Sequence, residues 1–106
     1  MARRKSEVAW ADPTLLILGS LAAGPKHGYA IILDTKENAD ITLGPGTLYG
    51  ALARLEERGL VRALPGQERR RPYEITAAGA ALLAARLKAM RSFSAHGLAR
   101  LRTARP

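Results

Sequence analysis

Apolar residues recur at helical spacing in the first half of the chain and predict a series of helices. Asp12 followed by Pro13 is a typical helix start, because the aspartate side chain can accept hydrogen bonds from free amides and proline is tolerated in the first turn. The apolar run that follows is wide enough for a largely buried helix. We expect this helix to end near Ala23, before Gly24-Pro25.

Two further helices are predicted before the basic segment of the chain. One begins between Lys26 and Gly28 and continues to the polar run 37–40, and the residues at helical spacing along it are Tyr29, Ile32, Leu33 and Lys36. The other begins at Gly44-Pro45 and ends at Gly59, which suits a left-handed cap. Its buried stripe is expected to be Leu48, Leu52 and Leu55.

The pattern then changes to short strands and returns to a long helix. Residues 61–64 and 71–75 favour strands, and the Pro, Gly and polar residues between them predict a hairpin with a loop of several residues. Thr76 is expected to cap a last helix rich in Ala, Leu, Arg and Lys, which are strong helix formers. This helix should reach at least Arg91, and Leu101 if it continues through Gly97.

The order of these elements defines the expected fold. It is mainly α with a small β-hairpin, a winged helix-turn-helix with a long C-terminal helix that serves dimerisation. Residues 1–76 form the winged helix-turn-helix DNA-binding region with its N-terminal arm, and residues 77–106 form the dimerisation helix with a basic tail. At 106 residues, both parts are expected in one compact domain.

Charge adds an expected partner to this fold. Seventeen Lys and Arg against nine Asp and Glu give a formal charge of +8, which favours binding to a polyanion by release of its counterions. A solvated basic surface kept for solubility is the alternative. The chain has no cysteine, and its apolar stretch 15–23 is too short to span a bilayer, so we expect a cytoplasmic protein without signal peptide or membrane helix.

The third helix is the expected recognition helix. Opposite its leucine stripe it carries small residues and Arg54, which would let its backbone approach a groove wall while the guanidinium reaches a phosphate or a guanine. The alternative is an ordinary amphipathic helix whose small residues pack elsewhere. Tyr49 is expected either to contact the DNA backbone or to be an aromatic residue at the edge of the core.

Three consecutive arginines follow the turn of the hairpin, at 69–71. We expect them to contact phosphate or to enter a minor groove, although solvated arginines without a partner are the alternative. The residues expected at the DNA interface are Lys26, His27, Gly46, Thr47, Tyr49, Gly50, Arg54, Arg69, Arg70 and Arg71.

Neither a catalytic nor a metal site is expected. His27 and His96 are far apart in sequence, and no Asp or Glu lies at ligand spacing with both. Glu56-Glu57 is interpreted as a solvated helical face rather than as acid and base. We therefore expect no enzyme and no cofactor.

The last helix carries an apolar pattern of about seven residues that a small domain cannot cover. Dimerisation is expected to bury Leu83, Leu87, Met90 and Leu101. The two-fold dimer positions its two recognition helices for a pseudo-palindromic site. The alternative is that this helix folds back on its own domain, because Ala80, Ala81 and Ala84 permit close packing within the chain.

Several separate motifs together resemble the PadR family of bacterial transcriptional regulators, in its smaller subfamily with a single C-terminal helix. The residues that carry this resemblance are His27-Gly28-Tyr29, Gly46 to Tyr49, Leu52, Leu55, Glu56, Gly59, Leu60, Tyr73, Ile75, Thr76 and Gly79. The resemblance implies a homodimeric transcriptional repressor that binds double-stranded DNA. It implies that a small aromatic or hydrophobic effector releases the repressor from the DNA. It also implies a pocket at the dimer interface, for which the matching positions are Trp10, Leu87, Met90 and Phe93.

The predicted function is thus a sequence-specific regulator of transcription that binds duplex DNA. Two alternatives stay open: a winged-helix module that binds an acidic protein, and an architectural protein that binds DNA without sequence preference. Salt dependence and sequence preference of duplex binding separate the three.

Overall fold

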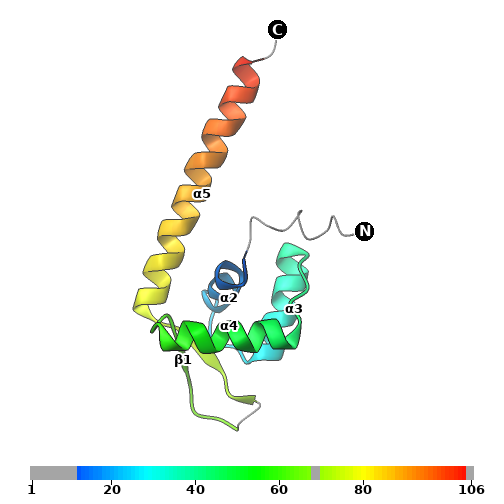
Figure 1. The fold of residues 1–106 in the computed structure, drawn as a ribbon, viewed down its shortest axis with the longest axis vertical. Coiled ribbons are helices and arrows are strands. Elements are labelled where there is room, and N and C mark those ends of the chain that lie inside the picture. The colour runs from blue at the N-terminus through cyan, green and yellow to red at the C-terminus, as the bar shows by residue number, and fades with distance from the viewer. Residues whose placement is uncertain (1–11, 68–69, 105–106) are drawn as a thin grey trace.

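The computed structural model describes residues 12–67 and 70–104. The helices are α2 (Pro13–Leu21), α3 (Gly28–Ala39), α4 (Pro45–Glu57) and α5 (Ala77–Thr103), and the strands are β1 (Val61–Ala63) and β2 (Tyr73–Ile75). Figure 1 shows α2, α3 and α4 gathered into a small domain, the hairpin on one side of it and α5 leaving on the other side. This confirms the predicted mainly helical fold with a hairpin and a long last helix.

Three predicted helix ends are set by the residues expected to set them. The Asp12 carboxylate accepts a hydrogen bond from the Leu15 amide at 2.9 Å, and the Thr76 hydroxyl accepts one from the Gly79 amide at 3.1 Å. Gly59 has a φ of +74°, the left-handed conformation that follows the last turn of α4. The end of α2, predicted near Ala23, comes slightly earlier. The last α-helical residue is Leu21, and a tight turn begins at Ala22.

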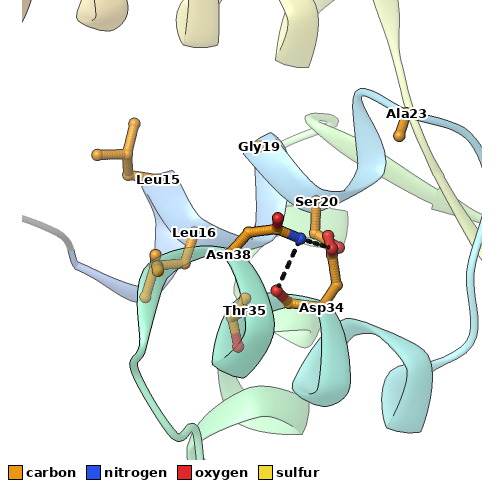
Figure 2. Close-up of a pocket in the computed structure, with 9 residues that line it drawn as sticks. Leu15, Leu16, Gly19, Ser20, Ala23, Asp34, Thr35 and Asn38 are labelled. Carbon is orange, nitrogen blue, oxygen red and sulfur yellow. Dashed lines mark hydrogen bonds between the residues drawn. The ribbon is translucent and has the colours of Figure 1, made fainter.

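Helix α3 contains most of the polar run at which it was expected to end. It continues through Ala39 and stops at Asp40, whose φ of +57° is left-handed. Within this run Asn38 donates hydrogen bonds to the backbone carbonyl and the carboxylate of Asp34, one turn earlier (Figure 2). The polar residues therefore form the solvent side of the last turns and not a connecting loop.

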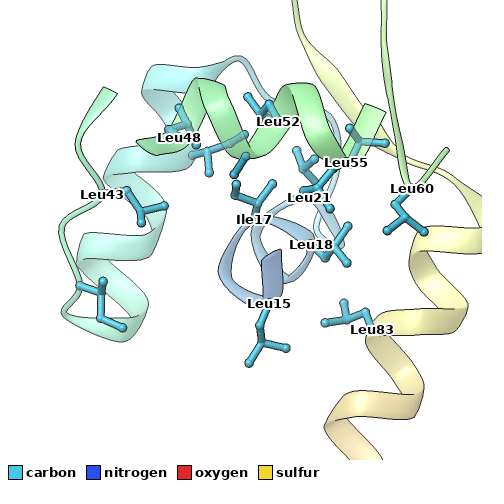
Figure 3. Packing of buried hydrophobic residues seen from close by; sticks show 14 residues of the cluster. Leu15, Ile17, Leu18, Leu21, Leu43, Leu48, Leu52, Leu55, Leu60 and Leu83 are labelled. Atoms are coloured by element: carbon cyan, nitrogen blue, oxygen red, sulfur yellow. The ribbon is translucent and has the colours of Figure 1, made fainter. Parts of the chain in front are cut away.

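The core forms around α2, which packs against α3, α4, α5 and β2. The predicted stripe of α4 is buried, and Figure 3 shows Leu52 and Leu55 lying over the α2 side chains. On α3 the buried residues are Gly28, Ile31 and Thr35, whereas Tyr29 is 65% and Leu33 is 51% exposed. Two residues of the predicted α3 pattern thus face outward, because α3 contributes only a narrow face to the core.

The hairpin is antiparallel, with Val61 opposite Ile75, Arg62 opposite Glu74 and Ala63 opposite Tyr73. Its ladder is shorter than the predicted strands at 61–64 and 71–75, in part because Pro72 has no amide to donate. The Leu64 amide still bonds to the Pro72 carbonyl at 2.8 Å. Beyond the hairpin ladder, the backbone of Lys26 exchanges two hydrogen bonds with Tyr73, so that the segment before α3 is tied to the first residue of β2.

The first turn of α5 lies directly on the end of the α4–β1 connection. A Cβ atom at Gly79 would collide with the backbone carbonyl oxygen of Leu60, which cannot move without breaking its hydrogen bond from the Thr76 amide. The hydroxyl of Thr76 also donates to the Gly59 carbonyl at 2.7 Å. Gly79 is therefore required for close approach, and it fixes the direction in which α5 leaves the domain.

This contact predicts opposite effects for two glycines of the same helix. We expect Gly79→Ala to lower the free energy of unfolding by about 1–3 kcal/mol, because the collision is with backbone. Gly97→Ala should raise it by up to about 1 kcal/mol, since a Cβ there meets no neighbouring atom and alanine favours helix. Urea denaturation of both variants measures the difference, and equal stabilities would contradict the close approach.

Beyond its first turns α5 extends away from the domain. The described chain measures 60 × 35 × 20 Å, and α5 runs along its long axis (Figure 1). Leu83 is the last buried leucine, whereas Leu87, Leu98 and Leu101 are exposed and Phe93 is 80% exposed. In this structure the helix does not fold back on its own domain, and an apolar stripe is left uncovered.

One ion pair holds α5 against the start of α2. The Arg86 guanidinium lies 3.2 Å from the Asp12 carboxylate, which also caps α2. Partial burial raises the pKa of Asp12, but hydrogen bonds from the Leu15 amide and from Arg86 outweigh it, so that the pKa lies below its ordinary value.

The lowered pKa gives Asp12 a defined pH dependence. We expect Asp12→Ala to lower the free energy of unfolding by about 1 kcal/mol at neutral pH. Because the folded pKa is below the unfolded one, this stabilisation is present above about pH 4 and is lost as the pH falls through the folded pKa. Denaturation curves of both proteins across a series from about pH 7 into acid check this, and a difference that does not shrink as the pH falls would disagree with it.

Candidate nucleic-acid interface

Helix α4 presents the predicted contact residues on its outward side. Leu48, Ala51, Leu52 and Leu55 are buried against the domain, and the helical period therefore turns the residues between them outward. Gly46, Thr47, Ala53 and Arg54 are exposed and Gly50 is half-buried. The expectation that small residues and one arginine share an outward face thus agrees with the structure.

Within the described residues, the first amides of α4 have no hydrogen-bond partner. Gly44 is the N-cap and Pro45 the first residue, and the first amide bonded within the helix is that of Leu48, to the Gly44 carbonyl at 2.9 Å. The amides of Gly46 and Thr47 precede it, so they add to the positive end of the helix dipole. A Cβ at Gly46 would meet open space, which leaves room for a large anionic partner at this end.

Arg54 extends the outward face toward the end of α4. Its guanidinium lies back along the helix, with one nitrogen 3.6 Å from where a Cβ of Gly50 would lie. The charge is exposed and forms no ion pair in the part of the chain that the structure describes. It is therefore available to a phosphate or to a base edge.

Tyr49 connects the motif at residues 46–49 with the motif at residues 27–29, which lies far from it in the sequence. Its ring covers the first turn of α3, where a Cβ at Gly28 would collide with the tyrosine hydroxyl and ring. Tyr49 is nevertheless 43% exposed. The ring therefore packs on α3 at the edge of the core, and a contact of its accessible part with the DNA backbone stays a prediction.

The segment before α3 is positioned by the hairpin. Lys26 pairs with Tyr73 through its backbone, and its ammonium group donates to the Ser20 carbonyl at 2.6 Å. His27 is the exposed N-cap of α3, but its side chain makes no capping hydrogen bond. Of these two predicted contact residues, His27 is free to reach a partner, and Lys26 is already occupied at the end of α2.

The hairpin carries two of the three predicted arginines within the described residues. Arg70 and Arg71 are both on the hairpin loop, where Arg71 is exposed and the Arg70 amide closes a turn onto the Gln67 carbonyl at 2.8 Å. Arg69 lies outside the described residues. The hairpin lies at the opposite end of the molecule from the free end of α5 (Figure 1).

Comparison with known proteins gives this arrangement a family. The sequence model of the transcriptional regulator PadR-like family matches residues 17–85, from α2 into α5. The chain belongs to the PadR family. PadR proteins are transcription regulators and not enzymes, so the predictions of the family and of a non-enzymatic role are confirmed.

Solved structures agree with this membership. A PadR family transcription regulator from Clostridium difficile R20291 superposes with a TM-score of 0.75 at 26% identity, over 84% of this chain and 97% of that one. A transcriptional regulator from Clostridium thermocellum, Cth-833, gives 0.70 at 28% identity, over 83% and 90%.

A curated relative is much longer than this PadR chain. An uncharacterized 37.1 kDa protein in transposon TN4556 of Streptomyces fradiae is 47% identical over 90 residues. The match covers 85% of this chain and 24% of that protein, so the chain spans about a quarter of the relative's length.

Among the described residues, those predicted to form an effector pocket do not line one common hollow. Trp10 lies outside the described residues. Leu87 lines a shallow hollow with Lys88, whereas Phe93 lines a separate one near the end of α5 with Leu98. Met90 is half-buried and packs against the edge of the core. The effector pocket between two copies of the chain therefore stays a prediction.

The PadR fold also brings together residues that sequence reasoning missed. Arg62 and Glu74 are opposite each other on β1 and β2 and form an ion pair. The signal was available in principle, because a charge of each sign lies in the middle of a predicted strand, but only the register makes them partners. Glu74 thereby neutralises one cation of the hairpin, which makes Arg70 and Arg71 its free charges within the described residues.

In the described part of this PadR chain, other site types find no support. Among residues 12–67 and 70–104, no group of three or more His, Asp or Glu side chains is placed to hold a metal ion. No helix of that part is both long and apolar enough to cross a membrane.

The contact between Gly28 and Tyr49 predicts energetic coupling. We expect Gly28→Ala to destabilise the wild-type protein, because the new methyl displaces the Tyr49 ring, and to cost less when Tyr49→Ala has removed that ring. Denaturation of the two single variants and the double variant should give a coupling free energy of about 0.5–3 kcal/mol. Additive effects would show that the two residues do not touch in solution.

Proposed function

We infer that the protein is a homodimeric transcriptional repressor that binds double-stranded DNA in a sequence-specific manner. The observation that supports this most is the outward face of α4, where small residues and free amides lie beside the exposed Arg54, with further arginines on the hairpin. Such a face fits the major groove, since the small residues permit close approach and the cations neutralise phosphates.

The DNA contacts are assigned to the elements that carry them. Thr47 and Arg54 contact base edges or phosphates in the major groove, and Arg70 and Arg71 contact the flanking backbone or the minor groove. The free amides at the start of α4 and His27 bind phosphates. Lys26 acts indirectly, by holding the hairpin to α3.

Dimerisation uses the uncovered stripe of α5. Leu87, Met90 and Leu101 continue the spacing that begins at the buried Leu83, and a second copy supplies the same stripe. Residues 1–76 then bind DNA while residues 77–106 set the distance between two copies of α4. A palindromic operator matches such a two-fold dimer.

Repression is steric, because a dimer on its operator blocks the promoter. A small aromatic or hydrophobic effector, held between the two copies by Trp10, Leu87, Met90 and Phe93, favours another separation of the two α4 helices and weakens DNA binding. A regulator of this kind acts where the DNA is, so the cytoplasm stays the expected location.

Selection of bound sequences from a random duplex pool tests the proposal. A preferred palindromic sequence bound with a steep negative salt dependence supports it. Salt dependence without sequence preference identifies an architectural DNA-binding protein, and failure to bind duplexes at low salt leaves the protein-binding alternative. Titration of the selected operator complex with planar aromatic compounds tests the effector, and an unchanged affinity rejects it.

A further inference from the structure

A groove between α2 and α3 lies apart from the elements assigned to DNA. Its volume is about 330 Å³, at the lower end of the range for small-molecule sites. It is lined by Leu15, Leu16 and Ser20 of α2 and by Asp34 and Asn38 of α3 (Figure 2). Asp34 and Asn38 belong to the second half of α3, whereas the hairpin contacts the segment before the first turn of α3. The groove and the hairpin are therefore at different ends of α3.

Ser20 supplies an unused hydrogen-bonding group to this groove. The residue is only 4% exposed, yet its hydroxyl has no hydrogen-bond partner among the described residues. The neighbouring Thr35 is equally buried, but its hydroxyl donates to the Ile32 carbonyl at 3.1 Å. Because a buried hydroxyl without a partner is unfavourable, Ser20 favours a bound group that can pair with it.

Asp34 gives the groove a charge opposite to that of the whole chain. Asn38 donates to one oxygen of the Asp34 carboxylate, which fixes the orientation of that carboxylate. None of the described residues that line the groove is Lys or Arg; the Lys26 ammonium lies outside the lining, on the Ser20 carbonyl at 2.6 Å, so Asp34 is the charge within the groove. A cation is therefore the complementary occupant of this end of the groove.

We propose that the groove binds a small organic cation, a primary ammonium attached to a short apolar body. The ammonium group donates to the Asp34 carboxylate and to the Ser20 hydroxyl oxygen, and the apolar body packs against Leu15 and Leu16. This site is distinct from the effector pocket between two chains and involves neither α5 nor α4.

Phenethylamine is a suitable probe, and 2-phenylethanol is its neutral match. Titrations followed by amide NMR should show phenethylamine shifting the signals of Gly19, Ser20 and Asp34, with binding by the alcohol at least about tenfold weaker. Asp34→Asn should weaken phenethylamine binding by about tenfold or more, and Ser20→Ala by a smaller factor. Glu37→Gln is the matched control, since this exposed carboxylate of α3 lies outside the groove.

A filling variant separates the groove from other surfaces. A Cβ at Gly19 meets no neighbouring atom, so Gly19→Leu can fill the groove without disturbing α2, and it should abolish binding. Equal affinities for amine and alcohol, wild-type affinity of Asp34→Asn, or shifts confined to α5 would each overturn the proposal. Absence of binding because a second copy covers Gly19 in the dimer would overturn it as well. None of these measurements uses DNA, so they fail or succeed independently of repression.

Discussion

Leu87→Gln combined with Leu101→Gln should turn the proposed homodimer into monomers and abolish high-affinity operator binding. Both leucines are exposed in the single chain, Leu101 by 67%, and lie on the stripe that continues from the buried Leu83. A dimer buries each leucine twice, and a buried leucine side chain contributes about 1.5–3 kcal/mol. Their loss should therefore weaken association by at least about a thousandfold, which sedimentation analysis over a range of concentrations measures.

Glutamine is chosen because it changes only the apolar character of the stripe. It favours helix, so α5 persists, and it leaves the net charge and hence the nonspecific attraction to DNA unchanged. The matched control is Ala85→Gln combined with Ser92→Gln, two exposed positions on the opposite side of α5. The control should remain a dimer. A Leu87/Leu101 variant that still associates like the wild type would place the dimer interface elsewhere.

The parts of the fold that were predictable from sequence are those with local causes. Asp12 and Thr76 cap helices through amides three residues later, and Gly59 ends α4 by its own left-handed conformation. The leucine stripe of α4 follows from helical period alone. In each case the interacting groups lie within the same element or next to its end, and spacing along the chain is enough to find them.

The parts that escaped sequence reasoning depend on pairs of distant residues. Gly28 and Tyr49 were both noted in motifs, but their contact appears only when α3 and α4 cross. Gly79 is likewise required by its contact with the Leu60 carbonyl, which lies in the connection between α4 and β1. The outward position of Tyr29 and Leu33 could not be foreseen either, because apolar residues lie on more than one side of α3 and their spacing does not select the buried side.

The same distinction applies to the DNA interface. Helical period predicts the outward residues of α4, and the turn predicts exposed arginines in the hairpin. The occupied ammonium group of Lys26 and the neutralised Arg62 depend instead on tertiary contacts, with the Ser20 carbonyl and with Glu74. Tertiary structure therefore selects which of the many basic residues are left to bind a polyanion.

Arg70→Gln combined with Arg71→Gln should remove a large part of the salt dependence of operator binding. Both residues lie on the hairpin loop, and within the described residues neither has an acidic partner. If each arginine contacts one phosphate, the double variant of a dimer loses about four phosphate contacts. This loss reduces the slope of log K against log salt by about 3.6. Taking binding at about 1 M salt as unchanged, this corresponds at about 0.1 M salt to a loss of affinity of about 4,000-fold, measurable by fluorescence anisotropy of labelled operator across a salt series.

Removal of two positive charges from the far end of α5 is the control. It separates direct phosphate contacts of the hairpin from the effect of total charge. Arg100→Gln with Arg102→Gln lowers the net charge equally, but both residues lie at the end of α5 that points away from the hairpin (Figure 1). Direct phosphate contacts by the hairpin predict a nearly unchanged slope for this control, since counterions are released only where side chains meet phosphate. Equal slopes for the two double variants would mean that total charge alone attracts DNA, and that the hairpin does not act as a wing.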